Sequence, residues 1–311
     1  MESKYIPKIG SKNFPGDFEY LYDDKTNLAA IKIAQKDSSY KLRKLDCWGL
    51  AYVNFLNEFA NANADGIQYH LEYFNEDKKA EIEALKRRIS FLAINNPDMV
   101  ISLLIEGNEI ELYGLDTLFN RPKTEIIRDG NIERDSGDAP GRLEKDLQAF
   151  IYHDGAIKNR RLAYFGEDFT DLTKDKSLGI LREFPTGVFQ TEVRESTRIM
   201  PTNYIDFVSF NKWKELTLIE LKVDDSSLEV ISQLLDYALF FTTYKSQLLP
   251  TLRTLFKGEY PETEKPKIAC YVVNNRFHPR FASLMKYYDT KGKGYGFEMK
   301  QVILGQTNEL Q

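Results

Sequence analysis

The chain has 311 residues, of which 42% are hydrophobic, 29% charged and 13% aromatic, as in one large globular domain or two ordinary ones. It has no run of about 18 apolar residues and no apolar N-terminal stretch, which argues against a membrane span or a signal peptide and predicts a cytoplasmic protein. The isolated Cys47 and Cys270 argue against a disulfide framework and a zinc site. The net charge of −5 argues against nonspecific coating of DNA but permits a local basic groove.

Residues 1–40 show no sustained periodicity. A first helix is predicted from about residue 40, because apolar residues recur at three- and four-residue steps across 45–59. A second helix is predicted over residues 75–94, where Asn75 suits the N-cap and acidic residues follow in the first turn.

Residues 99–114 contain two apolar runs about a Gly-Asn pair and favour a hairpin, although the first run is also compatible with a helix. Residues 120–141 are polar and contain prolines and glycines, which is typical of a linker or an exposed connection. We therefore place a boundary near residue 138. It separates a smaller N-terminal α+β domain of residues 1–138 from a second domain of residues 139–311.

The second domain is predicted to alternate helices and strands, an order that favours a mixed sheet flanked by helices. The expected elements are a helix at 142–155, strands at 160–168 and 187–195, two strands within 203–223 about a turn at 211–214, a helix at 226–248, a strand at 267–274, a helix at 279–289 and a strand at 294–304. The first of these helices has an apolar stripe of Leu143, Leu147, Phe150 and Ile151. Ser226 or Ser227 suits the N-cap of the second.

A charged pair lies inside the strand with the sequence LTLIELK. Glu220 and Lys222 share one face of it, because side chains alternate along a strand. If the preceding turn is centred on Trp213, residues whose numbers sum to 426 lie opposite each other, and Asp206 faces Glu220 with Cβ atoms about 5 Å apart. The other face is apolar and predicted to be core: Ile205, Phe207, Ile219, Leu221 and Val223.

Two carboxylates at this distance repel each other, and a hard divalent cation with oxygen ligands would relieve the repulsion. Lys222 adds positive charge where an attacking hydroxide or a developing phosphorane would need it. Downstream, Gln233 and Tyr237 are four residues apart and share a helix face. Upstream, Glu144 lies on the helix that opens the second domain, with Asp146 as a competing candidate.

These residues resemble the PD-(D/E)XK nuclease superfamily, which has the restriction-endonuclease-like fold. The Glu-Leu-Lys strand followed by a helix with Gln-Leu-Leu-Asp-Tyr resembles its RecB-type branch, whose helix carries a Gln-x-x-x-Tyr motif. The segment GRLEKDLQAF is similar to archaeal and actinobacterial endonucleases that act on branched or mismatched DNA. The resemblance covers about residues 142–305. It departs from the family motif at one point, since Asp206 follows an isoleucine and not a proline.

The resemblance implies a metal site and a role for each motif residue. Glu144, Asp206 and Glu220, with the Leu221 carbonyl as a further ligand, would hold Mg²⁺, for which Mn²⁺ would substitute. Lys222 would orient or activate water. Gln233 would contact a backbone phosphate or order the site, and Tyr237 would support it.

The function that follows is a Mg²⁺-dependent DNA endonuclease, in repair, restriction or antiphage defence. Four arginines are candidates for contacts with DNA phosphates: Arg160, Arg161, Arg194 and Arg198. The N-terminal domain would choose the substrate, dock a protein partner or form a homodimer. The alternative is a noncatalytic nuclease-like fold that binds nucleic acid or protein.

Overall fold

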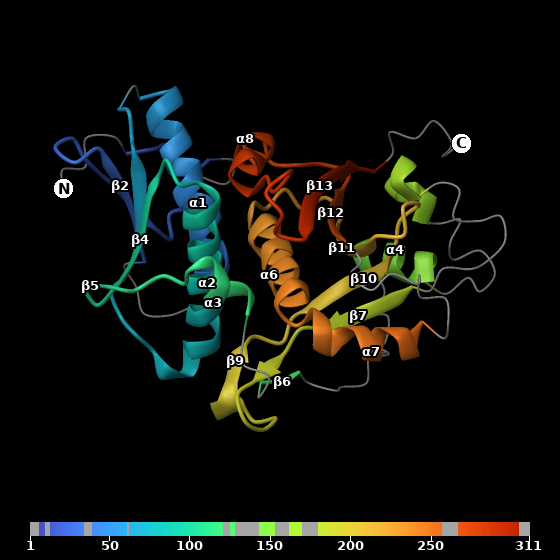
Figure 1. Ribbon diagram of the computed structural model, residues 1–311. Coiled ribbons are helices and arrows are strands. Elements are labelled where there is room, and N and C mark those ends of the chain that lie inside the picture. The colour runs from blue at the N-terminus through green and yellow to red at the C-terminus, as the bar shows by residue number, and fades with distance from the viewer. Residues whose placement is uncertain are drawn as a thin grey trace.

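The computed structural model describes residues 6–9, 13–33, 39–60, 62–120, 125–127, 143–152, 162–169, 180–256 and 267–304. In these ranges the chain forms two five-stranded mixed sheets with helices packed between them (Figure 1). The predicted combination of helices and mixed sheet is therefore confirmed. Among the described helices, none combines the length and the apolar character that a membrane crossing requires.

The N-terminal sheet has the order β1-β2-β3-β4-β5, with parallel pairs in its centre and antiparallel pairs at both edges. Its strands are β1 (Glu19–Asp23), β2 (Leu28–Ile33), β3 (Gly66–Leu71), β4 (Val100–Ile105) and β5 (Asn108–Glu109). Helices α1 (Ser39–Glu58) and α2 (Lys79–Asn95) pack on the side that faces the C-terminal half (Figure 1). The short helices η1 (Glu76–Lys78) and α3 (Leu115–Phe119) pack against α2.

Both predicted N-terminal helices and the hairpin about the Gly-Asn turn are confirmed. Asn75 caps the short helix η1, which runs directly into α2, and its Oδ1 accepts a hydrogen bond from the Asp77 backbone N–H at 2.9 Å. Strands β1, β2 and β3 were not predicted.

The C-terminal sheet has the order β13-β12-β11-β10-β7. Strand β12 is parallel to both neighbours, and β10 is antiparallel to both of its own. Its strands are β7 (Leu181–Pro185), β10 (Tyr204–Phe210), β11 (Leu216–Lys222), β12 (Ile268–Asn274) and β13 (Phe297–Ile303). A small antiparallel sheet joins β6 (Ile126–Ile127), β8 (Val188–Phe189) and β9 (Arg198–Met200).

Helices cover both faces of the C-terminal sheet. On one face α6 (Glu229–Thr243) packs in a large apolar cluster that also takes in α1 and α2, so the two halves share one core. On the other face Ile151 of α4 (Leu143–Tyr152) joins a smaller cluster with residues of β10, β11 and β12. The remaining helices are η3 (Ala163–Phe165), η4 (Glu167–Phe169), η5 (Glu195–Thr197), α7 (Lys245–Leu255), α8 (Phe281–Met285) and η6 (Lys286–Tyr288).

Several predicted elements differ from the structure. The strand expected at 160–168 is wrong, because its described part forms the 3₁₀ turns η3 and η4. The strand expected at 187–195 is reduced to the two residues of β8, and the helix expected at 226–248 divides at Tyr244 into α6 and α7. The boundary near residue 138 lies outside the described residues.

Two details of the predicted helices also need correction. On α4 the expected apolar stripe is confirmed only at Leu147 and Ile151, which join the core cluster. Leu143 and Phe150 are exposed, and Gln148 is buried. The N-cap position of α6 is Leu228, although the Ser227 hydroxyl accepts a hydrogen bond from the Glu229 backbone N–H at 3.3 Å.

Arg88 of α2 links α1, α2 and α6 through a buried ion cluster. Its side chain is 2% exposed and contacts Asp236 of α6 at 2.7 Å and Asp46 of α1 at 3.1 Å. Another of its nitrogens donates to the Leu42 carbonyl at 2.8 Å. Burial raises the pKa of Asp236 to about 6, although the Arg88 charge opposes this shift. Buried charges of this kind persist only where they are paired.

We expect Arg88→Met to lower the free energy of unfolding by about 3–5 kcal/mol, because it leaves the carboxylates of Asp46 and Asp236 buried without a cation. Denaturant titration of the full chain measures the change. The matched control is Lys79→Met in the exposed first turn of the same helix, for which we expect a change within about 0.5 kcal/mol. Equal stability of the two variants would contradict the assigned role of Arg88.

Candidate active site

The hairpin of β10 and β11 has the predicted register. Phe207 pairs with Ile219 and Phe210 with Leu216, so the numbers of paired residues sum to 426. The paired residues end at Phe207 and Ile219, so the predicted pairing of Asp206 with Glu220 itself is not part of the ladder. The two acids are nevertheless close, since Asp206 accepts the Leu221 backbone N–H at 2.7 Å and the Glu220 charge raises its pKa.

The acids of this hairpin are buried. Glu220 is 1% exposed, Asp206 8%, and the Lys222 side chain 17%. Phe207, Ile219 and Leu221 point to the other face, into the apolar cluster beneath α4, as predicted. Ile205 belongs to the cluster of α6 and Val223 is only half-buried, so these two depart from the prediction. A surface salt bridge does not describe this site, since both acids are buried and α4 contacts Asp206 and Lys222.

Lys222 supplies the positive charge next to these acids. Its Nζ lies 2.7 Å from Glu220 Oε1 and 3.3 Å from Glu144 Oε1 on α4. Burial alone would lower the pKa of the amine, but the charges of Glu220, Asp206 and Glu144 outweigh it and raise the pKa. Lys222 is therefore protonated at neutral pH. Of the two acids considered on α4, Glu144 makes this contact, and Asp146 is exposed.

Asp206 is held by two donors. Its Oδ1 accepts from Gln148 Nε2 of α4 at 2.6 Å, and its Oδ2 accepts from the Leu221 backbone N–H at 2.7 Å. Burial and then the Glu220 charge raise the pKa of Asp206 well above its usual range, against the opposing effect of Lys222. Leu221, predicted to offer its carbonyl to a metal, thus takes part through its N–H.

Glu220 has one oxygen paired and one free. Its Oε1 contacts Lys222, whereas Oε2 is buried and has no hydrogen-bond partner among the described residues. Burial raises the pKa of Glu220, and the Lys222 charge and the nearby Tyr237 hydroxyl limit the rise. A buried carboxylate oxygen without a donor is rare and needs an explanation.

Gln233 and Tyr237, the two motif residues of α6, lie next to each other, and Tyr237 is close to Glu220. Gln233 Nε2 donates to the Tyr237 hydroxyl at 2.7 Å, and that hydroxyl donates to the Tyr204 carbonyl at 3.0 Å. Burial raises the pKa of Tyr237, as does the Glu220 charge, so the phenol stays neutral. Their predicted common helix face is confirmed, and their contact ties α6 to the start of β10.

Gln148 is the residue that sequence reasoning missed. It is 3% exposed and follows Glu144 by four residues, so both lie on the face of α4 that meets the hairpin. That spacing was the available signal, but a stripe of larger apolar residues on the same helix obscured it.

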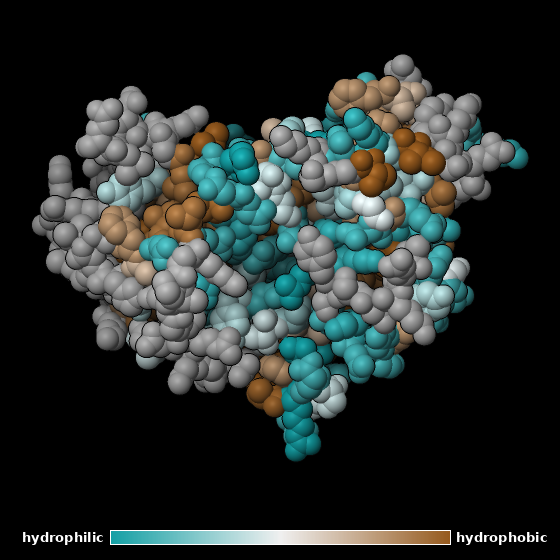
Figure 2. All heavy atoms as spheres, turned by 180° about the vertical axis from the view of Figure 1, so that it is seen from behind, coloured by the Kyte–Doolittle hydropathy of each residue, from teal (hydrophilic) through white to brown (hydrophobic). Residues whose placement is uncertain are grey.

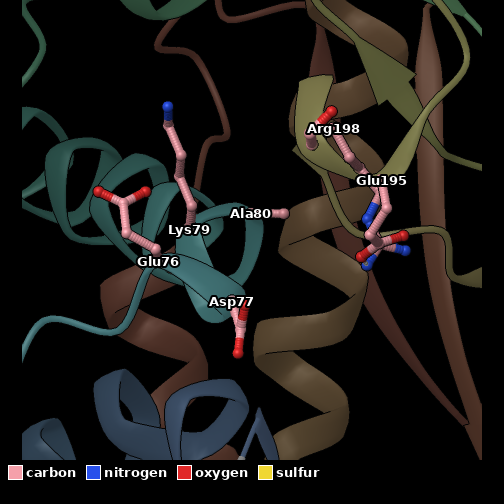
Figure 3. Close-up of a pocket in the computed structure, with 7 residues that line it drawn as sticks. Glu76, Asp77, Lys79, Ala80, Glu195 and Arg198 are labelled. Carbon is pink, nitrogen blue, oxygen red and sulfur yellow. Dashed lines mark hydrogen bonds and ion pairs between the residues drawn. The ribbon is translucent and has the colours of Figure 1, made fainter.

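The predicted phosphate-binding arginines are not gathered around this cluster in the described part of the chain. Arg194 pairs with Glu192 at 3.1 Å, and Arg198 pairs with Glu195. Arg198 lines a separate cleft of about 540 Å³ between the start of α2 and η5, in which Glu76, Asp77 and Glu195 outnumber the cations Lys79 and Arg198 (Figure 3). Arg160 and Arg161 lie outside the described residues.

The donor chemistry around Glu220 fits a divalent cation held by two carboxylates. Asp206 and Glu220 are acids from facing strands, and Glu220 Oε2 is unpartnered among the described residues. Mg²⁺ commonly takes only one or two protein carboxylates. In the described ranges, however, no set of three or more acidic, histidine or cysteine side chains is arranged to hold a metal, so Glu144 pairs with Lys222 and does not complete a three-acid site.

Comparisons of the chain with known protein families, curated proteins and solved structures find no match.

We expect Asp206→Asn to raise the free energy of unfolding at pH 7 by about 1–2 kcal/mol, because it removes one of two repelling buried acids. An acid whose pKa is raised by folding contributes stability below its unfolded pKa near 4, and that contribution is lost as the pH rises through the folded pKa. The variant should therefore lose stability less steeply than the wild type above pH 4. Denaturant midpoints from pH 4 to 8 measure both effects, and a variant less stable than wild type at pH 7 would contradict them.

Proposed function

We propose that the chain is a metal-dependent endonuclease that hydrolyses phosphodiester bonds of DNA, in repair, restriction or antiphage defence. The observation that carries the proposal is the buried set of Asp206, Glu220 and Lys222 on one hairpin, with Glu220 Oε2 unpartnered among the described residues. Burying two neighbouring acids lowers the free energy of unfolding, because both lose hydration and they repel each other. Pairs of perturbed acids and a lysine at one place are typical of catalytic sites.

The fold supports the same proposal. The hairpin β10-β11 lies in the middle of a mixed sheet, β11 continues through α6 to the parallel strand β12, and α4 brings Glu144 to the end of β11. This arrangement is compatible with the restriction-endonuclease-like fold suggested by the motifs, and we include that fold in the proposal. Asp206 and Glu220 would hold Mg²⁺ or Mn²⁺, with Gln233 and Tyr237 keeping α6 in place.

The metal, when bound, would polarise the phosphate and lower the pKa of a coordinated water. The residues of the chain have separate tasks. Lys222 stays protonated, so it orients water and stabilises negative charge on phosphate oxygens but does not remove a proton. Asp206 and Glu220 would hold the metal, whose charge would relieve the repulsion that raises the pKa values of both acids.

The second candidate is a noncatalytic module that binds nucleic acid or protein. One observation favours it: Lys222 already contacts both Glu220 and Glu144, so the ion cluster is partly neutralised by the chain itself. In this case the cluster would be structural, and divalent metal would change neither stability nor any activity.

We expect the wild-type chain to cut DNA with Mg²⁺ or Mn²⁺ and to be inactive with EDTA. Lys222→Ala and Glu220→Gln should each lower the rate by about 100-fold or more, since Lys222 would stabilise charge on the phosphate and Glu220 would hold the metal. Nicking of supercoiled plasmid measures the rate, and circular dichroism checks that the variants fold.

Lys212→Ala, on the exposed turn of the same hairpin, is the matched control and should keep full activity. If both site variants fold and cut DNA as fast as the wild type, the assigned site is refuted. No cutting by the wild type on single-stranded, duplex or branched DNA would leave the binding module as the better reading.

We expect Mg²⁺ to stabilise the wild-type chain, because a ligand that binds only the folded state adds about 1.4 kcal/mol at ten times its Kd. Thermal unfolding with Mg²⁺ and after EDTA measures this. Asp206→Asn and Glu220→Gln should abolish the rise in Tm, while Lys212→Ala should keep it. A wild-type Tm that is indifferent to Mg²⁺ and Mn²⁺ would contradict the metal assignment independently of any activity assay.

A further inference from the structure

Two buried oxygen atoms at the candidate active site have no hydrogen-bond partner among the described residues. They are Glu220 Oε2 and Gln148 Oε1, and the two residues are 1% and 3% exposed. Polar side chains at the surface are satisfied by water, and hydrophilic residues line the hollow between the two halves on the face opposite to that of Figure 1 (Figure 2). The two buried oxygens have no such solvent contact, so their lack of a partner needs an explanation.

The orientation of the Gln148 amide is fixed by Asp206. Its Nε2 donates to Asp206 Oδ1 at 2.6 Å. An ionised carboxylate accepts hydrogen bonds but does not donate them, so the amide nitrogen and not the amide oxygen faces the acid. The oxygen is bonded to the same carbon as that nitrogen and therefore also lies near Asp206, where it adds partial negative charge.

Glu220 approaches the same place from the neighbouring strand. Its Oε1 contacts Lys222 Nζ at 2.7 Å, which leaves Oε2 without a counter-charge of its own. Asp206 Oδ2 accepts from the backbone N–H of Leu221, the residue after Glu220, at 2.7 Å. Oxygen atoms of Asp206 on β10, Glu220 on β11 and Gln148 on α4 are thus brought together.

A divalent cation satisfies these oxygens better than a hydrogen-bond donor does. Three carboxylates, those of Glu144, Asp206 and Glu220, face the single ammonium group of Lys222. Two negative charges are left over, and one divalent cation carries the charge that balances them. Hard cations such as Mg²⁺ and Mn²⁺ take both carboxylate and amide carbonyl oxygens as ligands. A buried water would donate to the free oxygens but would leave the charge uncompensated.

Helix α4 offers two polar residues to the site, one turn apart. Glu144 contacts Lys222 at 3.3 Å, and its side chain is 31% exposed. Gln148 is buried and contacts Asp206. Glu144 is therefore engaged with the ammonium group, and Gln148 is the residue of α4 that lies next to an acid of the metal site.

We propose that Gln148 is a ligand of the divalent cation, with its Oε1 completing an oxygen set that includes Asp206 and Glu220. The inference rests on the proposed metal-dependent function and deepens it. It assigns to a neutral amide the position that the family resemblance gives to Glu144. The amide has a second task, since its N–H orients Asp206.

The first test is the affinity of the full chain for Mn²⁺ in the absence of DNA, measured from the electron paramagnetic resonance signal of free Mn²⁺. We expect Gln148→Met, which keeps the size of the side chain but has no oxygen, to weaken binding by about 10- to 100-fold. Gln148→Glu keeps an oxygen at this position and should bind within about 3-fold of the wild type or more tightly. The matched control is Asp146→Asn, on the exposed face of the same helix, which should leave the affinity unchanged.

The second test needs no variant. In a crystal structure of the wild-type chain with Mn²⁺, we expect the anomalous signal of the ion within about 2.5 Å of Gln148 Oε1. An ion that binds Asp206 and Glu220 but is separated from Gln148 by a water would overturn the ligand assignment, while the metal-dependent function stands.

The remaining outcomes separate this inference from the proposed function. Unchanged Mn²⁺ affinity in a folded Gln148→Met variant would also overturn the ligand assignment alone. If the wild-type chain binds Mn²⁺ through Gln148 but cuts no DNA, the assignment stands and the nuclease proposal fails. If the wild-type chain binds neither Mn²⁺ nor Mg²⁺, both are overturned.

Discussion

The structure depends on buried charges that are neutralised where they lie. Helix α6 separates two such clusters, with Arg88 between Asp46 and Asp236 on one side and Lys222 against Glu220 on the other. Arg88 holds buried carboxylates of α1 and α6, whereas Lys222 contacts the buried Glu220 of its own strand and the partly exposed Glu144 of α4. Because separating Arg88 from Asp236 leaves an uncompensated charge in the interior, this contact fixes α6 against α2 more narrowly than apolar packing alone. The active-site proposal depends on that fixed position.

The two clusters differ in how completely they are satisfied. Arg88 has an anion or a carbonyl on three sides, and Ser232 and Tyr288 donate to Asp46. Both clusters hold one base and more than one acid, but the excess of acid is larger at the hairpin, where Glu220, Asp206 and Glu144 surround Lys222. That larger deficit of positive charge is the physical reason to propose a function for the hairpin cluster.

The parts of the fold and site that the sequence predicted are those governed by short-range periodicity. The alternation in residues 204–222 gave the hairpin, its register and the meeting of Asp206 with Glu220, and the three- to four-residue spacing on α6 gave the common face of Gln233 and Tyr237. Such patterns follow from local geometry and need no knowledge of the partner element.

The parts that were missed depend on what each element packs against. On α4 the apolar Leu143 and Phe150 are exposed, while Gln148 is buried because Asp206 accepts its hydrogen bond, and only the assembled site makes that favourable. Strand β2 buries Ala29, Ala30 and Ile31 in succession, so it lacks the alternation of a strand with one wet face. Strand β3 does alternate at Ile67, Tyr69 and Leu71, a signal that was present but not used.

The ion cluster around Arg88 also sets an order of events during synthesis. Its partner Asp236 follows 148 residues later in the chain. At about 5–20 residues per second, a ribosome needs roughly 7–30 s to add that many residues. Throughout this interval α1 and α2 exist without the helix that covers their outer face, and the guanidinium has only Asp46 as its anion. The apolar surface that α1 and α2 bury against α6 therefore stays exposed until α6 has been synthesised.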